Sequence, residues 1–164
     1  MIYSLHINDS MNRAVEFFEE KGLKDKVRVM QESTATAVEA AEALGIDVGK
    51  IAKSLTFRTN ERPVLIVMSG DAKIDSKKFR NTFNVSSKML DAADVEKYTG
   101  YTIGGVCPFN LLTNEIDVYL DKSLERFDVV YPGCGAHDTL VETSLDELKE
   151  LSNYVDIIDI GKGW

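Results

Sequence analysis

The sequence predicts an α/β fold of the α+β kind, with a mixed, mostly antiparallel, barrel-like sheet flanked by helices. Three observations support this prediction. Short strand-like stretches alternate with amphipathic helical stretches along the chain. Tight turns such as residues 59–63 favour antiparallel neighbours over regular βαβ repeats. The length of 164 residues suits one compact core, so we expect a single domain over residues 1–164.

In the first half of the chain, apolar spacing predicts a helix from Ser10 to Lys21 that stops at Gly22. Thr36 is a suitable N-cap for a second helix that stops at Gly45, and Asp47 can cap one further turn. Strands are expected over residues 27–30, 53–58 and 64–68. The last two should form a hairpin, and the wholly apolar last one is typical of a central strand covered on both faces.

In the second half of the chain, helices are expected over residues 75–83, 92–99 and 144–151. Aspartates stand at the start of the first two, and Ser144 with Glu147 forms a capping box at the third. Asp121 can cap a short turn through Phe127. Strands are expected over residues 115–120, 129–131, 139–142 and 154–160, the last at a sheet edge.

The composition is that of an ordinary globular protein, with 44% hydrophobic and 28% charged residues. No apolar run approaches the roughly 20 residues that cross a bilayer, and the first residues lack the pattern of a secretory signal. We therefore expect a cytoplasmic protein without a membrane partner. The 19 basic and 27 acidic residues give a net charge of −8, which argues against broad DNA binding.

Several patterns that suggest familiar sites fail their requirements. Gly45–Lys50 has too few residues between its glycines for a phosphate loop, and residues 100–105 do not match the dinucleotide pattern. The cysteines and histidines lack metal-ligand spacing, so neither a metal nor a cofactor is expected. Cys134 and His137 could form a nucleophile and base, but this spacing in one loop usually arises by chance.

Two glycine-rich loops and one lysine are the candidate functional elements. In the loop over residues 100–109, the glycines permit positive φ and Pro108 restricts the chain, so backbone groups can be aimed at a ligand; an ordinary turn is the alternative. The second loop covers residues 131–137. Lys53 shares a strand face with Leu55, and if enclosed it needs an anion, carbonyl groups or a lowered pKa; otherwise it reaches water.

The segment from Lys73 to Lys88 carries five basic residues against Asp75 alone. Such a segment is either a solvated helix face or a local surface that meets the end of a nucleic acid.

Three segments resemble, in order and spacing, the family of YbaK and the prolyl-tRNA-synthetase editing domains: residues 51–55 (IAKSL), residues 100–108 (GYTIGGVCP) and residues 131–135 (YPGCG). The resemblance extends from about Val27 to Leu151. It implies a barrel-like sheet with flanking helices and hydrolysis of the ester that joins a wrong amino acid to the 3′ adenosine of a transfer RNA. The expected substrate is tRNA-Pro carrying a small amino acid such as Cys, Ala or Ser. The resemblance permits a prolyl-tRNA synthetase as a partner.

Site residues follow from the same resemblance. Lys53 would contact the terminal adenosine or its phosphate, and the loop beginning at Gly104 and Gly105 would hold the attacking water and the substrate carbonyl. The residues expected to bind the substrate are Ser54, Val106, Cys107, Pro108, Gly133, Cys134, Gly135 and His137. The residues expected to bind tRNA are Lys73, Lys77, Lys78 and Arg80.

Two other functions fit the sequence. The chain could be a module of the same fold that binds tRNA, a nucleotide or a protein without turnover. Alternatively, Lys53 could form a Schiff base with a carbonyl compound.

Overall fold

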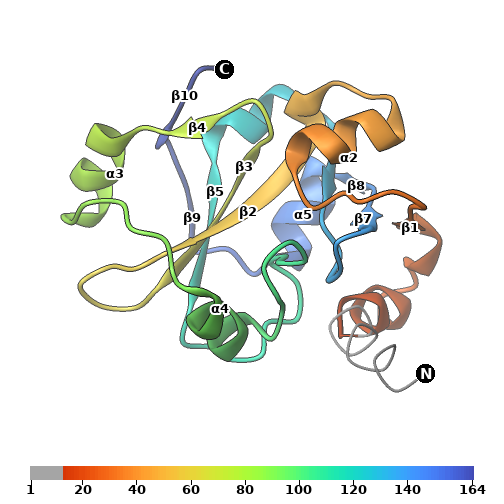
Figure 1. Ribbon diagram of the computed structural model, residues 1–164, viewed down its shortest axis with the longest axis horizontal. Helices are drawn as coiled ribbons and strands as arrows, with labels where there is room; N and C mark the ends of the chain where they lie inside the picture. The colour runs from red at the N-terminus through yellow and green to blue at the C-terminus, as the bar shows by residue number, and fades with distance from the viewer. Residues whose placement is uncertain (1–12) are drawn as a thin grey trace.

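The computed structural model describes residues 13–164. Its centre is a mixed six-stranded sheet that curls into a half-barrel, with strand order β8-β6-β2-β3-β5-β9 (Figure 1). The strands are β2 (Ile51–Phe57), β3 (Val64–Ser69), β5 (Asp117–Asp121), β6 (Val129–Pro132), β8 (Thr143–Ser144) and β9 (Asp156–Ile158). Two small antiparallel sheets pair β1 (Val27–Val29) with β7 (Thr139–Val141), and β4 (Lys73–Ile74) with β10 (Gly161–Lys162).

The α/β fold and the mixed, barrel-like sheet are confirmed. The six-stranded sheet is not mostly antiparallel, however, because three of its five strand pairings are parallel. The hairpin β2–β3 and the pair β6–β8 are antiparallel, whereas β2–β6, β3–β5 and β5–β9 are parallel. The tight turn before β3 explains the hairpin. The pair β3–β5 can be parallel because the chain between these strands passes through two helices and the first glycine loop, which is long enough for a crossover.

The helices lie where the capping residues predict them. They are α2 (Ala37–Leu44), α3 (Ser76–Phe83), α4 (Ala92–Thr99) and α5 (Leu145–Leu151), with short 3-10 turns at Lys24–Lys26, Val48–Lys50 and Lys122–Arg126. Capping boxes hold the starts of α2 and α5, and Gly45 ends α2 in the left-handed conformation. A further helix covers residues 13–20, whereas its predicted cap, Ser10, lies outside the described residues.

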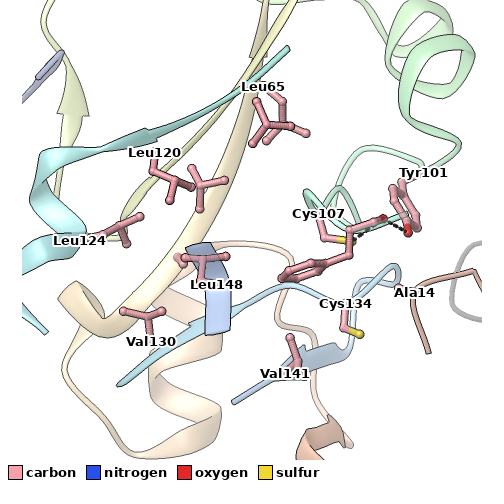
Figure 2. Close-up of a cluster of buried hydrophobic side chains, with 14 of the residues drawn as sticks. Ala14, Leu65, Tyr101, Cys107, Leu120, Leu124, Val130, Cys134, Val141 and Leu148 are labelled. Carbon is pink, nitrogen blue, oxygen red and sulfur yellow. Dashed lines mark hydrogen bonds between the residues drawn. The ribbon is translucent and has the colours of Figure 1, made fainter. Parts of the chain in front are cut away.

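Hydrophobic packing on both faces makes β3 the central strand of the sheet, since all six of its residues are buried. One face, which includes Leu65, belongs to a buried cluster with Leu148 of α5 (Figure 2). Phe18 of the N-terminal helix is part of the same cluster. The opposite face, which includes Ile66, packs against Phe79 of α3. The expectation of a central strand covered on both faces is therefore confirmed.

One pairing was not predicted from the sequence. Beyond the last strand expected from the sequence, β10 pairs with β4 and aligns Lys162 with Lys73. Both strands have only two residues, so neither carries a readable alternation on its own. Within residues 13–164, no helix has the length and apolar character needed to cross a membrane.

Candidate active site

A pocket of about 290 Å³ opens along one edge of β2. Its walls come from the segment before α2, from β2, from the segment before α4, from α4, and from both glycine loops. The residues that line it are Thr34, Ala35, Thr36, Ala37, Ile51, Ala52, Lys53, Ser54, Leu55, Thr56, Met89, Leu90, Val95, Ile103, Gly104, Val106, Gly133 and Leu140. Among the described residues that line the pocket, Lys53 alone is charged, so the pocket is a mainly apolar cleft with one cation.

The Lys53 side chain is half-buried and held by backbone carbonyl groups. Its Nζ donates to the carbonyl oxygens of Ala72 (2.5 Å) and Gly70 (3.3 Å), in the turn after β3. An ammonium group has three N–H donors, so one remains for a ligand in the pocket. Burial lowers the pKa of Lys53 below its ordinary value, while the nearby Asp71 raises it and Lys73 lowers it.

An ion pair fixes the turn that holds Lys53. Arg126 donates two hydrogen bonds to the Asp71 carboxylate, from Nη2 to Oδ1 (2.6 Å) and from Nη1 to Oδ2 (3.0 Å). These bonds hold the pKa of Asp71 below its usual range. The Arg126 guanidinium also lies over the rings of Phe127 (4.8 Å) and Trp164 (5.0 Å). The turn after β3 is thus anchored by Arg126, which lies in the 3-10 turn that follows β5.

The first glycine loop is closed on itself by a buried tyrosine. The Tyr101 hydroxyl donates to the Phe109 carbonyl (2.6 Å), which joins the two ends of the loop, and Tyr101 is fully buried. Between them, Gly104 has a φ of 96°, a conformation that favours glycine, and the Gly105 N–H donates to Thr102 (2.9 Å). Gly104 and Val106 therefore face the pocket on a preshaped loop.

The two glycine loops pack directly against each other. A Cβ at Gly105 would lie only 2.8 Å from the Gly135 carbonyl oxygen, so only glycine allows this approach. Gly133 lines the pocket, whereas His137 is exposed and lies outside the lining. The Cβ of His137 is 4.0 Å from the Cβ position that an alanine at residue 104 would occupy, so residue 137 lies close to the pocket-lining Gly104.

The two cysteines lie in the core and not in the pocket. Cys107 and Cys134 are fully buried and appear among Val141, Leu148 and other apolar side chains in Figure 2. Burial raises the pKa of Cys107 to about 11 and also raises that of Cys134. Both are therefore neutral thiols at neutral pH, which removes the nucleophile from a Cys134–His137 pair. Pro108 and Gly135 are also buried outside the lining and shape the loops from behind.

The basic residues of the α3 region differ in whether their side chains already have hydrogen-bond partners within the protein. Lys78 Nζ contacts Asp159 Oδ1 (3.0 Å) and the Gly161 carbonyl (2.9 Å), and Arg80 donates to Ser86 (2.9 Å). Lys73 and Lys77 are exposed.

Several lining residues could not be recognised in the sequence. Met89 and Ile103 are apolar yet 54% and 65% exposed, which leaves apolar surface at the pocket for a ligand to cover. Ala35 comes from the segment before α2, which Thr34 ties to the second loop through a 3.1 Å hydrogen bond to the His137 carbonyl. In the sequence, this region was recognisable only through Thr36, which predicted the start of α2. Asp71 and Arg126 gave no signal because their pairing spans 55 positions.

Fold and site together define a domain whose pocket offers a fixed cation and shaped backbone groups rather than a titratable nucleophile. The family model described as aminoacyl-tRNA editing domain matches residues 31–151, so the chain belongs to the aminoacyl-tRNA editing domain family. The resemblance to YbaK and the prolyl-tRNA-synthetase editing domains is thereby confirmed. The substrate class of this family is aminoacyl-tRNA.

Individual relatives agree with this assignment. The chain is 44% identical to YwhH of Bacillus subtilis over 142 residues, which is 86% of this chain and 90% of YwhH. It is 29% identical to EbsC of Enterococcus faecalis, a candidate Cys-tRNA(Pro)/Cys-tRNA(Cys) deacylase, over 74% of this chain and 75% of EbsC. A proline–tRNA ligase of Caldicellulosiruptor bescii is 26% identical over 84% of this chain but only 24% of the ligase.

A solved structure described as a candidate trans-editing enzyme for prolyl tRNA synthetase superposes with a TM-score of 0.83. It is 31% identical, and the match covers 94% of this chain and 98% of that one.

Proposed function

We propose that the protein is a trans-editing aminoacyl-tRNA deacylase that hydrolyses tRNA-Pro carrying a small wrong amino acid such as Cys, Ala or Ser. The observation that carries the proposal is that Lys53 and the Gly104 loop line one pocket in a chain of the editing family. The similarity to EbsC, a candidate Cys-tRNA(Pro) deacylase, and to the solved structure of a candidate trans-editing enzyme supports a substrate of this kind.

In the proposed reaction, water adds to the ester carbonyl carbon and the carbonyl oxygen becomes an oxyanion. The bond from this carbon to the ribose 3′ oxygen then breaks, and that oxygen takes a proton, so the products are the free amino acid and intact tRNA. Backbone groups of the Gly104 loop would hold the water and the carbonyl, since a preorganised loop needs little rearrangement during the reaction.

Lys53 would act as a cation that binds the terminal adenosine or its phosphate. Although burial lowers its pKa, the neighbouring Asp71 acts in the opposite direction, and two carbonyl oxygens solvate the ammonium. A base for the water would then come from the substrate itself, through its ribose hydroxyl or its amino group.

The pocket volume suits the role of a second sieve. A synthetase distinguishes amino acids that differ by one methylene only about 10- to 200-fold, so small errors must be removed by a separate hydrolytic site. The pocket of about 290 Å³ also has to accommodate part of the adenosine, which favours a small amino acid.

The test is release of labelled amino acid from alanyl-, cysteinyl- and seryl-tRNA-Pro. We expect hydrolysis of at least one of them, and a loss of about 100-fold or more in Lys53→Ala. Lys50→Ala is the matched control because it removes a lysine outside the pocket. Circular dichroism establishes that each variant folds. Binding without hydrolysis across the panel would favour the binding module, and unchanged activity in Lys53→Ala would exclude the proposed role of this residue.

A further inference from the structure

Strand β2 has a stretch of unpaired edge that lies in the pocket. Toward β3, the pairing runs without interruption from Ala52 to Phe57. Toward the other side, β6 pairs only with residues 51 and 52, and Met89 forms a single bridge with Phe57. Among residues 13–164, no strand pairs with residues 53–56 on this edge. The sheet therefore has a gap between β6 and the segment around Met89, and the gap opens on the pocket lining.

The hydrogen bonds at the Met89 side of the gap show which backbone groups face it. The Leu90 N–H donates to the Thr56 carbonyl (3.1 Å), and the Arg58 N–H donates to the Lys88 carbonyl (2.9 Å). The backbone groups of the even-numbered residues of β2 therefore point toward this edge.

The other edge confirms the alternation. The Gly70 N–H donates to the Ile51 carbonyl (2.8 Å), so the odd-numbered residues of β2 point toward β3. Because backbone groups alternate along a strand, the N–H and the C=O of Ser54 both point into the gap. The next bond of the parallel β2–β6 ladder would join the Ser54 N–H to Gly133, but this pairing ends at Ala52 and Pro132.

The free groups of Ser54 are complementary to an α-aminoacyl ester. In the hydrogen-bonded pairs of an antiparallel sheet, two facing residues exchange both bonds through the N–H and C=O of each. An aminoacyl ester carries its amino group and its carbonyl on one carbon, as a residue does. We propose, on the basis of the proposed function, that the substrate's aminoacyl group occupies the gap as the missing residue of an antiparallel strand. Its carbonyl accepts from the Ser54 N–H, and its amino group donates to the Ser54 C=O.

The charge of the pocket supports this pairing over a side-chain contact. None of the described residues that line the pocket is acidic, so only hydroxyl and backbone carbonyl oxygens are available there to accept from the substrate's amino group. The Ser54 N–H also points where negative charge develops, because it would hydrogen-bond the carbonyl oxygen that becomes the oxyanion. Ser54 thereby joins the Gly104 loop as a source of backbone groups in the pocket.

The same pairing makes residue 54 a determinant of amino-acid size. Side chains of directly opposed residues in an antiparallel pair lie on the same face, with Cβ atoms about 5 Å apart. The substrate's side chain would therefore lie beside that of Ser54, whose Oγ is buried without a hydrogen-bond partner among the described residues. A larger residue at position 54 would restrict the space for the amino acid.

Amide hydrogen exchange by NMR tests the pairing directly. The probe is 3′-deoxy-3′-(L-alanylamino)adenosine, whose amide link cannot be hydrolysed as an ester. We expect the Ser54 N–H of the free chain to exchange faster than that of Leu55, which faces β3, and to slow at least about tenfold at saturating probe. The Leu55 N–H is the internal control and should not change. Ser54→Ala should show the same protection, because the pairing uses only the backbone.

The outcomes separate this inference from the proposed function. If the probe shifts the signals of Gly104 and Lys53 but leaves the exchange of the Ser54 N–H unchanged, the pairing is wrong and the deacylase proposal stands. If no pocket signal responds and no aminoacyl-tRNA is hydrolysed, both fail.

A substrate series provides a second readout. The rates for alanyl-, lactyl- and propionyl-tRNA are each divided by the hydroxide-catalysed rate of the same ester, which removes differences in intrinsic reactivity. Propionyl-tRNA has no donor for the Ser54 carbonyl, so its normalised rate should fall at least about tenfold below that of alanyl-tRNA, with lactyl-tRNA between them. Equal normalised rates would overturn the pairing.

Discussion

At the scale of single residues, the pKa of Lys53 depends on its burial and on two charged neighbours, one acidic and one basic. Burial lowers its pKa below the ordinary 10.5, while Asp71 opposes this shift and Lys73 adds to it. A lowered pKa means that the unfolded chain binds this proton more tightly than the folded one. The free energy of unfolding therefore rises as the pH increases from the lowered pKa to 10.5, and the cost of burying the ammonium is fully present below that range.

We predict that substitutions of the two neighbours move the pKa of Lys53 in opposite directions. Asp71→Asn should lower it further because the attracting charge is lost, whereas Lys73→Gln should raise it because a repelling charge is lost. The measurement is an NMR titration of the lysine side chains, with the Lys53 signal assigned from Lys53→Ala. Lys162→Gln serves as the control for a general change in surface charge. Shifts of the same sign in both variants would contradict this explanation.

At the scale of structural elements, the site depends on the close approach of two loops. The first loop is closed by Tyr101 and Phe109, and the second is tied to the segment before α2 through Thr34. Gly105 and Gly135 are in backbone contact where the loops meet. The shape of the pocket is therefore a property of the pair of loops and not of either one.

We predict that Gly105→Ala separates the loops. Its Cβ would lie 2.8 Å from the Gly135 carbonyl oxygen and 3.0 Å from the Ala136 Cα, and these are backbone atoms that cannot rotate away. The free energy of unfolding should fall by about 1–3 kcal/mol, the usual cost of overpacking, and hydrolysis should fall with it.

Gly133→Ala is the matched control for stability. Its Cβ would meet its nearest neighbour, the Val106 carbonyl oxygen, at 3.5 Å, which is an ordinary contact. Chemical denaturation of the two variants and the parent chain compares them. Equal stabilities for Gly105→Ala and Gly133→Ala would show that the loop contact is not tight.

At the scale of the whole molecule, a chain of net charge −8 carries exposed lysines on the paired strands β4 and β10 and on α3. The pairing of β4 with β10 places Lys162 opposite Lys73, and like charges in register are unfavourable unless an anion lies between or above them. Lys77 lies nearby at the start of α3, beyond the single acidic cap Asp75. We therefore regard this surface, defined by Lys73, Lys77 and Lys162, as the proposed contact for the tRNA backbone.

We predict that Lys73→Gln combined with Lys77→Gln weakens tRNA binding and reduces the salt dependence of the association constant by a slope of about one to two, since each lost phosphate contact removes about 0.9. The double variant Lys21→Gln with Lys149→Gln has the same net charge and is the control. Lys78→Gln should instead lower the free energy of unfolding, because Lys78 already pairs with Asp159. Identical salt slopes for both double variants would show that the surface is only a solvated face.

The sequence by itself determined the elements and the family. Caps such as Thr36, Asp91 and Ser144 predicted the helices because these signals are local and lie within one turn of the backbone they stabilise. The apolar run of β3 identified the sheet centre, and the spacing of three short motifs indicated the editing family.

The tertiary structure decided which candidates share the pocket. It brought Lys53, Ser54, Gly104, Val106 and Gly133 together and placed Cys107 and Cys134 in the core, because the direction of a loop side chain depends on what packs behind the loop. The anchoring of Asp71 by Arg126 and the open edge at Ser54 were equally unreadable in advance. Both depend on strand pairing between distant segments, where register and not local composition decides which backbone groups remain free.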